Sequence, residues 1–130
     1  MLLARAARGK LRFPTIIMST EQFLYLETRG RTTGQPREIE IWFVELGGRY
    51  YIVAEKRENA AWVKNMRAHS PVAFSVGSRV DKESRVRRTV ALAQVLEGAT
   101  EADAAGRVRQ LMDRKYGWSD GLVIEIVPST

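Results

Sequence analysis

The sequence predicts a mainly β fold of the α+β class, a small, closed or nearly closed antiparallel barrel of six strands with helices over its openings. Three observations lead to this prediction. Short apolar or alternating segments, which are typical of strands, recur from Glu21 to the C-terminus. The first three are too close together for parallel crossovers, so they must pair antiparallel. Only two segments have helical periodicity, and 130 residues suit a single domain.

The opening strands have the clearest patterns. Residues 23–26 are aromatic and aliphatic, and a turn-rich segment follows them. Residues 37–46 then alternate as a half-buried strand does. Its apolar side holds Ile39, Ile41 and Phe43, and its other side holds Glu38, Glu40 and Trp42. Gly47-Gly48 predicts a tight hairpin turn, because such turns need positive φ, and residues 50–54 form the returning strand.

Two helices separate the later strands. The first is predicted from a cap at Asn59 to about His69, where Ser70-Pro71 ends it. Strands over 72–76 and 85–96 follow. The second helix is predicted to begin at Thr100, to bury a stripe made of Ala105, Val108, Leu111 and Met112, and to end at Gly117. Residues 122–127 form the closing strand, so the order is β-β-β-α-β-β-α-β.

Composition excludes several kinds of site. The chain has no cysteine, which rules out disulfides, thiolate zinc sites, iron–sulfur clusters and a cysteine nucleophile. Its one histidine, His69, is expected to be structural or exposed, and we predict no metal site. The glycine motifs of dinucleotide-binding and P-loop proteins are absent. No apolar run approaches the roughly 20 residues of a membrane span.

The net charge of +6 belongs mostly to the N-terminus. Residues 1–17 carry four basic side chains and no acid, while the rest is nearly balanced, so we expect no nucleic-acid partner. We expect residues 1–17 to be an N-terminal extension, either poorly ordered or translated from a start codon upstream of Met18. The alternative is a short helix that packs over a site or touches a membrane surface. Residues 18–130 are expected to form the folded domain, in the cytoplasm.

The segment 29–37 has the composition of a phosphate site. It concentrates three arginines, two threonines, two glycines and a proline between two strands. Guanidinium and hydroxyl groups donate to phosphate oxygens, and glycines let backbone N–H groups approach. A solvated turn remains the alternative interpretation.

These residues also carry a resemblance. Residues 28–37, read as TRGRTTGQPR, resemble the start of the deazaflavin-dependent nitroreductase family, in the flavin-binding split-barrel group that includes pyridoxamine-phosphate-oxidase-like proteins. Residues 51–56 (YIVAEK) and 61–72 (AWVKNMRAHSPV) resemble its second signature, and residues 116–121 (YGWSDG) are similar to the closing segment of shorter members. The resemblance covers roughly residues 21–127. It implies a six-stranded antiparallel split β-barrel with two or three flanking helices over residues 18–130.

The resemblance also implies cofactor-binding residues. Four would hold the phosphate tail of the cofactor: Arg31, Thr32, Thr33 and Arg37. Members commonly have lysine or arginine at the position of Thr32, so the charge here is reduced. The segment beside the ring would be Ala54, Glu55, Lys56 and Arg57, on a strand supported by the helix residues Trp62 and Asn65. No catalytic residue is assigned, because the cofactor carries the chemistry.

The implied function is an oxidoreductase that uses reduced deazaflavin (coenzyme F-420) or FMN. It would transfer hydride to small electron-poor substrates such as quinones or nitroaromatics. The alternative is a non-catalytic module on the same barrel that binds or carries flavin, deazaflavin or haem. Tyr25, Trp42, Tyr51 and Trp118 are candidates for an apolar substrate face. Because split barrels often dimerise, we expect a homodimer.

Overall fold

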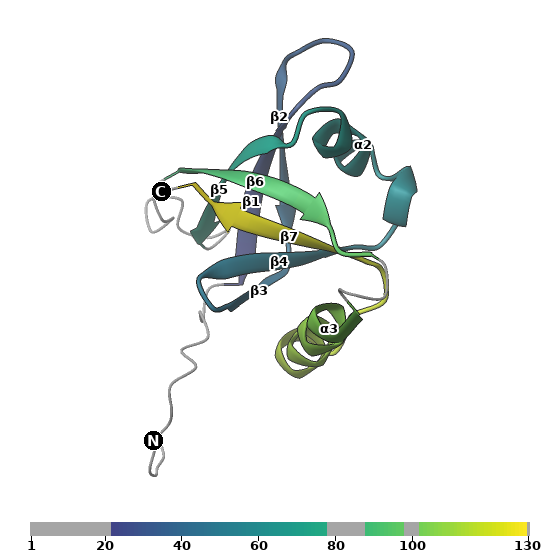
Figure 1. Ribbon diagram of the computed structural model, residues 1–130. Helices are drawn as coiled ribbons and strands as arrows, with labels where there is room; N and C mark the ends of the chain where they lie inside the picture. Colours follow the sequence, from purple (N-terminus) through teal and green to yellow (C-terminus); the bar gives the residue numbers. More distant parts are fainter. Residues whose placement is uncertain (1–21, 78–87, 98–101, 130) are drawn as a thin grey trace.

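The computed structural model describes residues 22–77, 88–97 and 102–129 (Figure 1). The predicted extension, residues 1–17, lies outside these ranges, as do Thr100 and the first part of the predicted 85–96 strand. The described strands are β1 (Phe23–Arg29), β2 (Pro36–Ile41), β3 (Phe43–Leu46), β4 (Arg49–Ala54), β5 (Pro71–Gly77), β6 (Thr89–Val95) and β7 (Leu122–Pro128). The helices are η1 (Arg57–Asn59, a 3-10 turn), α2 (Ala61–Ala68) and α3 (Ala102–Tyr116).

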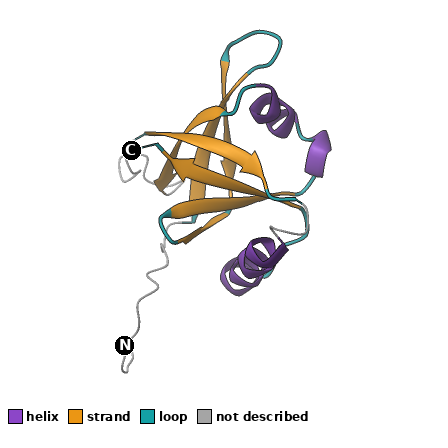
Figure 2. Ribbon diagram, viewed as in Figure 1, coloured by secondary structure: helices purple, strands orange, loops and turns teal. Residues whose placement is uncertain are grey.

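All seven strands belong to one antiparallel sheet in the order β2-β1-β5-β6-β7-β4-β3. The sheet curls on itself, with α2 and α3 at its periphery (Figure 2). The strands at its two edges, β2 and β3, follow each other in the chain but do not pair with each other. The predicted class, a mainly β split barrel with flanking helices, is therefore confirmed. The chain at Trp42 connects the two sheet edges, but no strand pairing joins them, so the barrel is open between β2 and β3.

The number of strands differs from the prediction for one reason. The segment predicted as a single strand over 37–46 is two strands, divided at Trp42. Before Trp42 the chain pairs with β1, with Ile41 opposite Leu24, and after it the chain pairs with β4, with Phe43 opposite Ile52. Ile39, Ile41 and Phe43 contact the same apolar cluster, so their period of two continues across Trp42 and led to the prediction of one strand. The alternation is interrupted only by the apolar run 41–44, which by itself does not show that the chain changes its partner.

The helix predictions were mostly confirmed. Gly117 has a φ of 75° directly after α3, which is how a helix commonly ends. The predicted cap at Asn59 was wrong. Asn59 belongs to η1, and α2 begins after Ala60 with no side-chain cap. No helix in the described part of the chain is both long and apolar enough to cross a membrane.

Two apolar clusters hold the fold together. The first fills the barrel and includes Leu24, Leu26 and Phe43. The second lies between α3 and the outer face of β3, β4 and β7, and contains the whole predicted helical stripe: Ala105, Val108, Leu111 and Met112. This packing fixes the C-terminal end of α3 beside Trp42, which brings the segment after α3 to the split between the sheet edges.

A buried carboxylate lies on the outer face of the sheet. Glu125 is 5% exposed and accepts hydrogen bonds from Arg49 Nη1 (3.1 Å), Tyr51 Oη (2.9 Å) and Gln94 Nε2 (2.7 Å). Burial by itself raises the pKa of Glu125, but these donors outweigh it and leave the pKa below its usual value. Burial and the bond to Glu125 raise the pKa of Tyr51 to about 12. The Tyr51 hydroxyl is therefore part of the hydrogen-bond network around Glu125.

Candidate functional site

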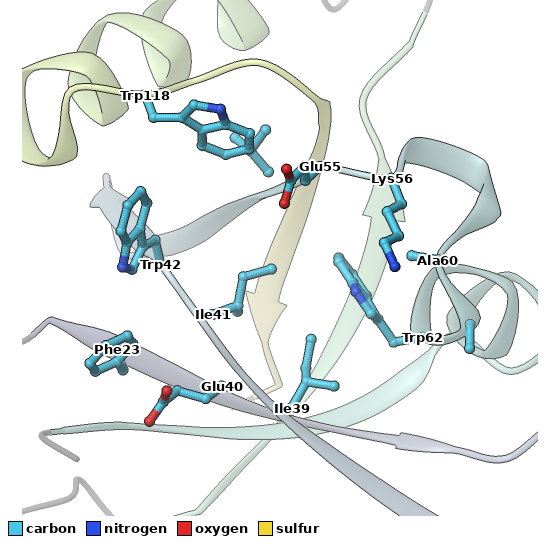
Figure 3. A pocket seen from close by; sticks show the side chains of 12 residues that line it. Phe23, Ile39, Glu40, Ile41, Trp42, Glu55, Lys56, Ala60, Trp62 and Trp118 are labelled. Atoms are coloured by element: carbon cyan, nitrogen blue, oxygen red, sulfur yellow. The ribbon is translucent and has the colours of Figure 1, made fainter.

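A groove of about 760 Å3 follows the split in the barrel (Figure 3). We call it the split groove. It is lined by Phe23, Ile39, Glu40, Ile41, Trp42, Val53, Glu55, Lys56, Ala60, Ala61, Trp62 and Trp118. In Figure 3, Ile39 and Ile41 lie between the indoles of Trp42 and Trp62, and Glu55 points its carboxylate inward. Three indoles and several aliphatic side chains give it the apolar surface that suits a planar aromatic ligand.

The sheet edges supply polar backbone to this groove. Strand β2 pairs only with β1, so its other edge has no strand beside it in the described chain. Strand β3 begins at Phe43, opposite Ile52, so Val53 and Ala54 extend beyond it toward the groove. Unpaired strand edges present N–H and C=O groups. Such groups can bind the polar rim of a heterocyclic ring whose faces lie against tryptophan.

The Trp42 end of the groove is held by the segment after α3. The ring of Trp42 stacks on Tyr116 at 4.6 Å and 5°, and it meets Trp118 edge-on at 6.3 Å and 69°. The Tyr116 hydroxyl accepts a hydrogen bond from Phe43 N at 3.2 Å and lies 2.7 Å from Gln22 O. Burial raises the pKa of Tyr116 to about 12, so this hydroxyl stays protonated at neutral pH. The stack therefore fixes the orientation of Trp42.

Of the four predicted substrate-face aromatics, Trp42 and Trp118 line the split groove. Tyr25 and Tyr51 do not, and that part of the prediction was wrong. Tyr25 donates to Glu40 at 3.0 Å, and Tyr51 bonds to Glu125 as described above. Both side chains belong to the outer face, because alternate residues of a strand point to opposite faces.

A second pocket of about 280 Å3 lies at the β1–β2 hairpin and shares Ile39, Ala61 and Trp62 with the split groove. We call it the hairpin pocket. Its other lining residues are Gly30, Arg31, Thr32, Thr33, Arg37 and Asn65. The shared residues make the two hollows adjacent, so one elongated ligand can occupy both.

The hairpin loop is built so that donors remain available. Gly30 N donates to Gln35 O and Gly34 N donates to Gly30 O, each at 2.8 Å. Gly34 has a φ of 73°, which favours glycine. A Cβ on Gly30 would lie 2.7 Å from Thr33 Oγ1, so the Thr33 side chain would have to move to admit one. The backbone N–H of Thr32 makes no hydrogen bond to any residue that the structure describes.

The three arginines of the segment 29–37 line two different hollows. Arg31 and Arg37 line the hairpin pocket, whereas Arg29 lines a separate outer depression together with His69 and Arg88. Among the residues described, the guanidinium of Arg37 has no hydrogen-bond or ion-pair partner. Arg31 is tied to Asn65, whose Oδ1 accepts from Arg31 Nη1 at 2.8 Å.

Eight of the ten cofactor-binding residues expected from the sequence lie at these two hollows. Six line the hairpin pocket: Arg31, Thr32, Thr33, Arg37, Trp62 and Asn65. Glu55 and Lys56 line the split groove, as does Trp62. The other two line neither hollow. The side chain of Ala54 is 1% exposed and belongs to the core, although its backbone lies at the end of β4 beside the groove. Arg57, with a φ of 53°, pairs with Asp120 at 3.0 Å.

Sequence reasoning missed several groove residues. Phe23, Ile39, Glu40, Ile41, Val53, Ala60 and Ala61 line the split groove, and none was a candidate. The alternation in 37–46 placed Ile39 and Ile41 on the apolar side, which was the available signal. It could not distinguish a side chain in the closed core from one at the open split.

The sequence profile described as F420H(2)-dependent quinone reductase matches residues 5–114. The chain belongs to this family. Deazaflavin-dependent reductases are therefore its relatives, and the resemblance stated from the motifs is confirmed. No curated protein sequence matches the chain significantly.

Three solved structures illustrate how widely this fold is shared. The haem storage protein HutZ from Vibrio cholerae is 17% identical, with a TM-score of 0.67 over 85% of this chain and 84% of HutZ. An F420 reductase is 18% identical, with a TM-score of 0.62 over 85% and 88%. A pyridoxamine 5′-phosphate oxidase-like protein from Listeria innocua is 17% identical, with a TM-score of 0.64 over 84% and 85%. At these identities the similarity establishes the fold alone.

Proposed function

We propose that this member of the quinone reductase family binds reduced coenzyme F-420 or FMN and transfers hydride to a small quinone or nitroaromatic. The observation that carries the proposal is the adjacency of the two hollows. A pocket with two guanidiniums and two hydroxyls opens beside a groove lined by three indoles. A cofactor with a phosphate at one end and a planar ring at the other needs this arrangement.

The residues present fit such a cofactor. Arg37, Thr32 and the free N–H groups of Arg31 would hold the phosphate through charge-assisted and hydroxyl hydrogen bonds. The unpaired backbone edge of β2 and the backbone of Val53 would face the polar rim of the ring. When bound, the reduced deazaflavin supplies a hydride from its central ring carbon. The side chains orient the ring and the substrate, and the indoles exclude water from the groove.

The proposal is tested with purified protein, F-420 and FMN, by following the fluorescence or absorbance of each cofactor as protein is added. Oxidation of reduced cofactor is then followed with a benzoquinone and with a nitroaromatic. We expect saturable binding of at least one cofactor and turnover with at least one substrate. Protein that binds neither cofactor would contradict the proposal.

The second candidate is a carrier or sensor without turnover. The similarity in fold to a haem storage protein favours it. Against haem, the single histidine, His69, lines the outer depression and neither of the two hollows. A Soret band after addition of haem, or tight binding of F-420 without oxidation by any substrate, would favour this candidate.

We further propose that the chain acts as a cytoplasmic homodimer without a nucleic-acid partner. Two large apolar side chains on one face of β6 are exposed to solvent: Val90 (54% exposed) and Leu92 (53%). No other large apolar side chain in the described part of the chain is as exposed. A second copy covering them would remove this apolar surface from water. Sedimentation velocity of the wild type and of Leu92→Lys tests this, and a monomeric wild type would contradict it.

A further inference from the structure

Among the polar residues that line the hairpin pocket, Asn65 is the buried one. It is 5% exposed and lies on α2, whose other buried residues, Val63 and Met66, pack into the barrel. Its carboxamide makes three hydrogen bonds. Oδ1 accepts from the backbone N–H of Arg31 at 3.2 Å and from Arg31 Nη1 at 2.8 Å, and Nδ2 donates to Thr28 Oγ1 at 3.3 Å.

These bonds join three parts of the molecule. Thr28 is near the end of β1 and 2% exposed, Arg31 is in the hairpin loop, and Asn65 is fixed by the packing of α2. Arg31 Nη1 also lies 3.4 Å from Ala61 O, at the start of the same helix. The long and otherwise mobile side chain of Arg31 is thus held at one nitrogen. Its remaining N–H groups stay available at the hairpin pocket.

We infer that Asn65 is a positioning residue that binds no part of the cofactor and fixes Arg31 in advance for contact with the phosphate. The inference rests on the proposed function. It directs Asn65 to Arg31 and the hairpin, whereas the sequence led us to expect it to support the strand beside the ring. Both lone-pair directions of Oδ1 are used by Arg31, and one Nδ2 hydrogen is used by Thr28. Holding a flexible arginine before the ligand arrives removes part of the entropic cost of binding.

The experiment measures phosphate preference, the ratio of dissociation constants for riboflavin and FMN. The same ratio is taken for 8-hydroxy-5-deazariboflavin and its 5′-phosphate, so that a preference for either cofactor class is detected. We expect Asn65→Ala to lower the preference about tenfold, and Lys64→Ala, an exposed neighbour on the same helix, to leave it unchanged. Melting temperatures are recorded for every variant.

A double-mutant cycle separates positioning from direct contact. If Asn65 acts through Arg31, the variant with both Arg31→Ala and Asn65→Ala should show the same phosphate preference as Arg31→Ala alone. Independent losses that multiply would overturn the inference, because Asn65 would then contact the cofactor itself.

Asn65→Asp keeps the test decisive if the alanine variant does not fold. A carboxylate still accepts both bonds from Arg31, and it can accept from the Thr28 hydroxyl in place of donating to it, but it neutralises the charge of Arg31. We therefore expect a folded variant with a loss of phosphate preference of tenfold or more. A loss of the same size when Asn65→Asp is made in the Arg31→Ala variant would overturn the inference, because the carboxylate would then act on the phosphate directly and not through Arg31. Arg37→Ala tests the phosphate site separately from the positioning role of Asn65. If it loses the preference while all Asn65 variants keep it, positioning is wrong. If wild type shows no preference, the inference and the phosphate site are both wrong.

Discussion

Removing the guanidinium of Arg37 is the most direct test of the phosphate site. Arg37 lines the hairpin pocket and, among the described residues, has no partner to lose. Arg37→Ala should therefore leave the fold intact while removing a charged donor. Arg31→Ala would be harder to interpret, because it also removes the side-chain hydrogen bond to Asn65.

The expected magnitude follows from the exposure of Arg37. A hydrogen bond to a charged group contributes about 1.5–3 kcal/mol. Because Arg37 is exposed and screened by solvent, the lower end applies, about 1.5 kcal/mol, or roughly a tenfold rise in Kd. The difference should shrink as ionic strength rises toward about 1 M, where the Debye length is about 3 Å.

Fluorescence titration with F-420 and FMN, at low and at high salt, measures this effect. Arg29→Ala is the matched control, because Arg29 is an exposed arginine of the same loop that lines the outer depression. We expect Arg29→Ala to bind as wild type does. Equal losses in the two variants would mean that only overall charge matters, and no loss in either would refute a phosphate site at this hairpin.

Three further changes test the rest of the structure. Trp42→Ala, which removes the ring stacked on Tyr116, should raise the KM for a quinone about tenfold and also lower the melting temperature, because the ring packs against the second apolar cluster; an unchanged KM in the folded variant would remove Trp42 from the substrate site. Gly121→Ala should destabilise the protein by about 1–3 kcal/mol in urea titrations, because its Cβ would overlap Ala54 O; wild-type stability would show that the strand ends can move apart. The lowered pKa of Glu125 means that its charged form stabilises the fold above the ordinary glutamate pKa of about 4.3, and that this stability is lost as the pH falls below it. Glu125→Gln should therefore reduce the acid dependence of the unfolding free energy measured between about pH 5 and pH 3, and an unchanged slope would contradict the assignment.

Much of the site was predictable because its signals are local. The loop 30–35 has a positive φ at Gly34, which favours glycine, and the segment 29–37 places hydroxyls and guanidiniums between two strands. Turn chemistry of this kind depends on neighbouring residues in the chain, so the sequence predicted the hairpin and its donors. The same holds for the turn at Gly47-Gly48, where both φ values are positive.

The parts that were missed depend on contacts between distant segments. The change of partner at Trp42 was missed because Ile39 and Ile41 before it and Phe43 after it contact the same apolar cluster, so the period of two runs across both strands. The stack of Trp42 on Tyr116 joins residues 74 positions apart in the chain, through the packing of α3. No local periodicity encodes such a contact.

The amino-acid sequence by itself determined the succession of strands and helices, the single-domain class and the chemistry of the hairpin loop, because propensity, alternation and turn geometry act over a few residues. The tertiary structure alone decided where the barrel stays open, which tryptophans line the opening, and that Asn65 holds Arg31. Those features arise when the curled sheet brings its two edges, α2 and the end of α3 together, and this closure is set by packing of the whole core.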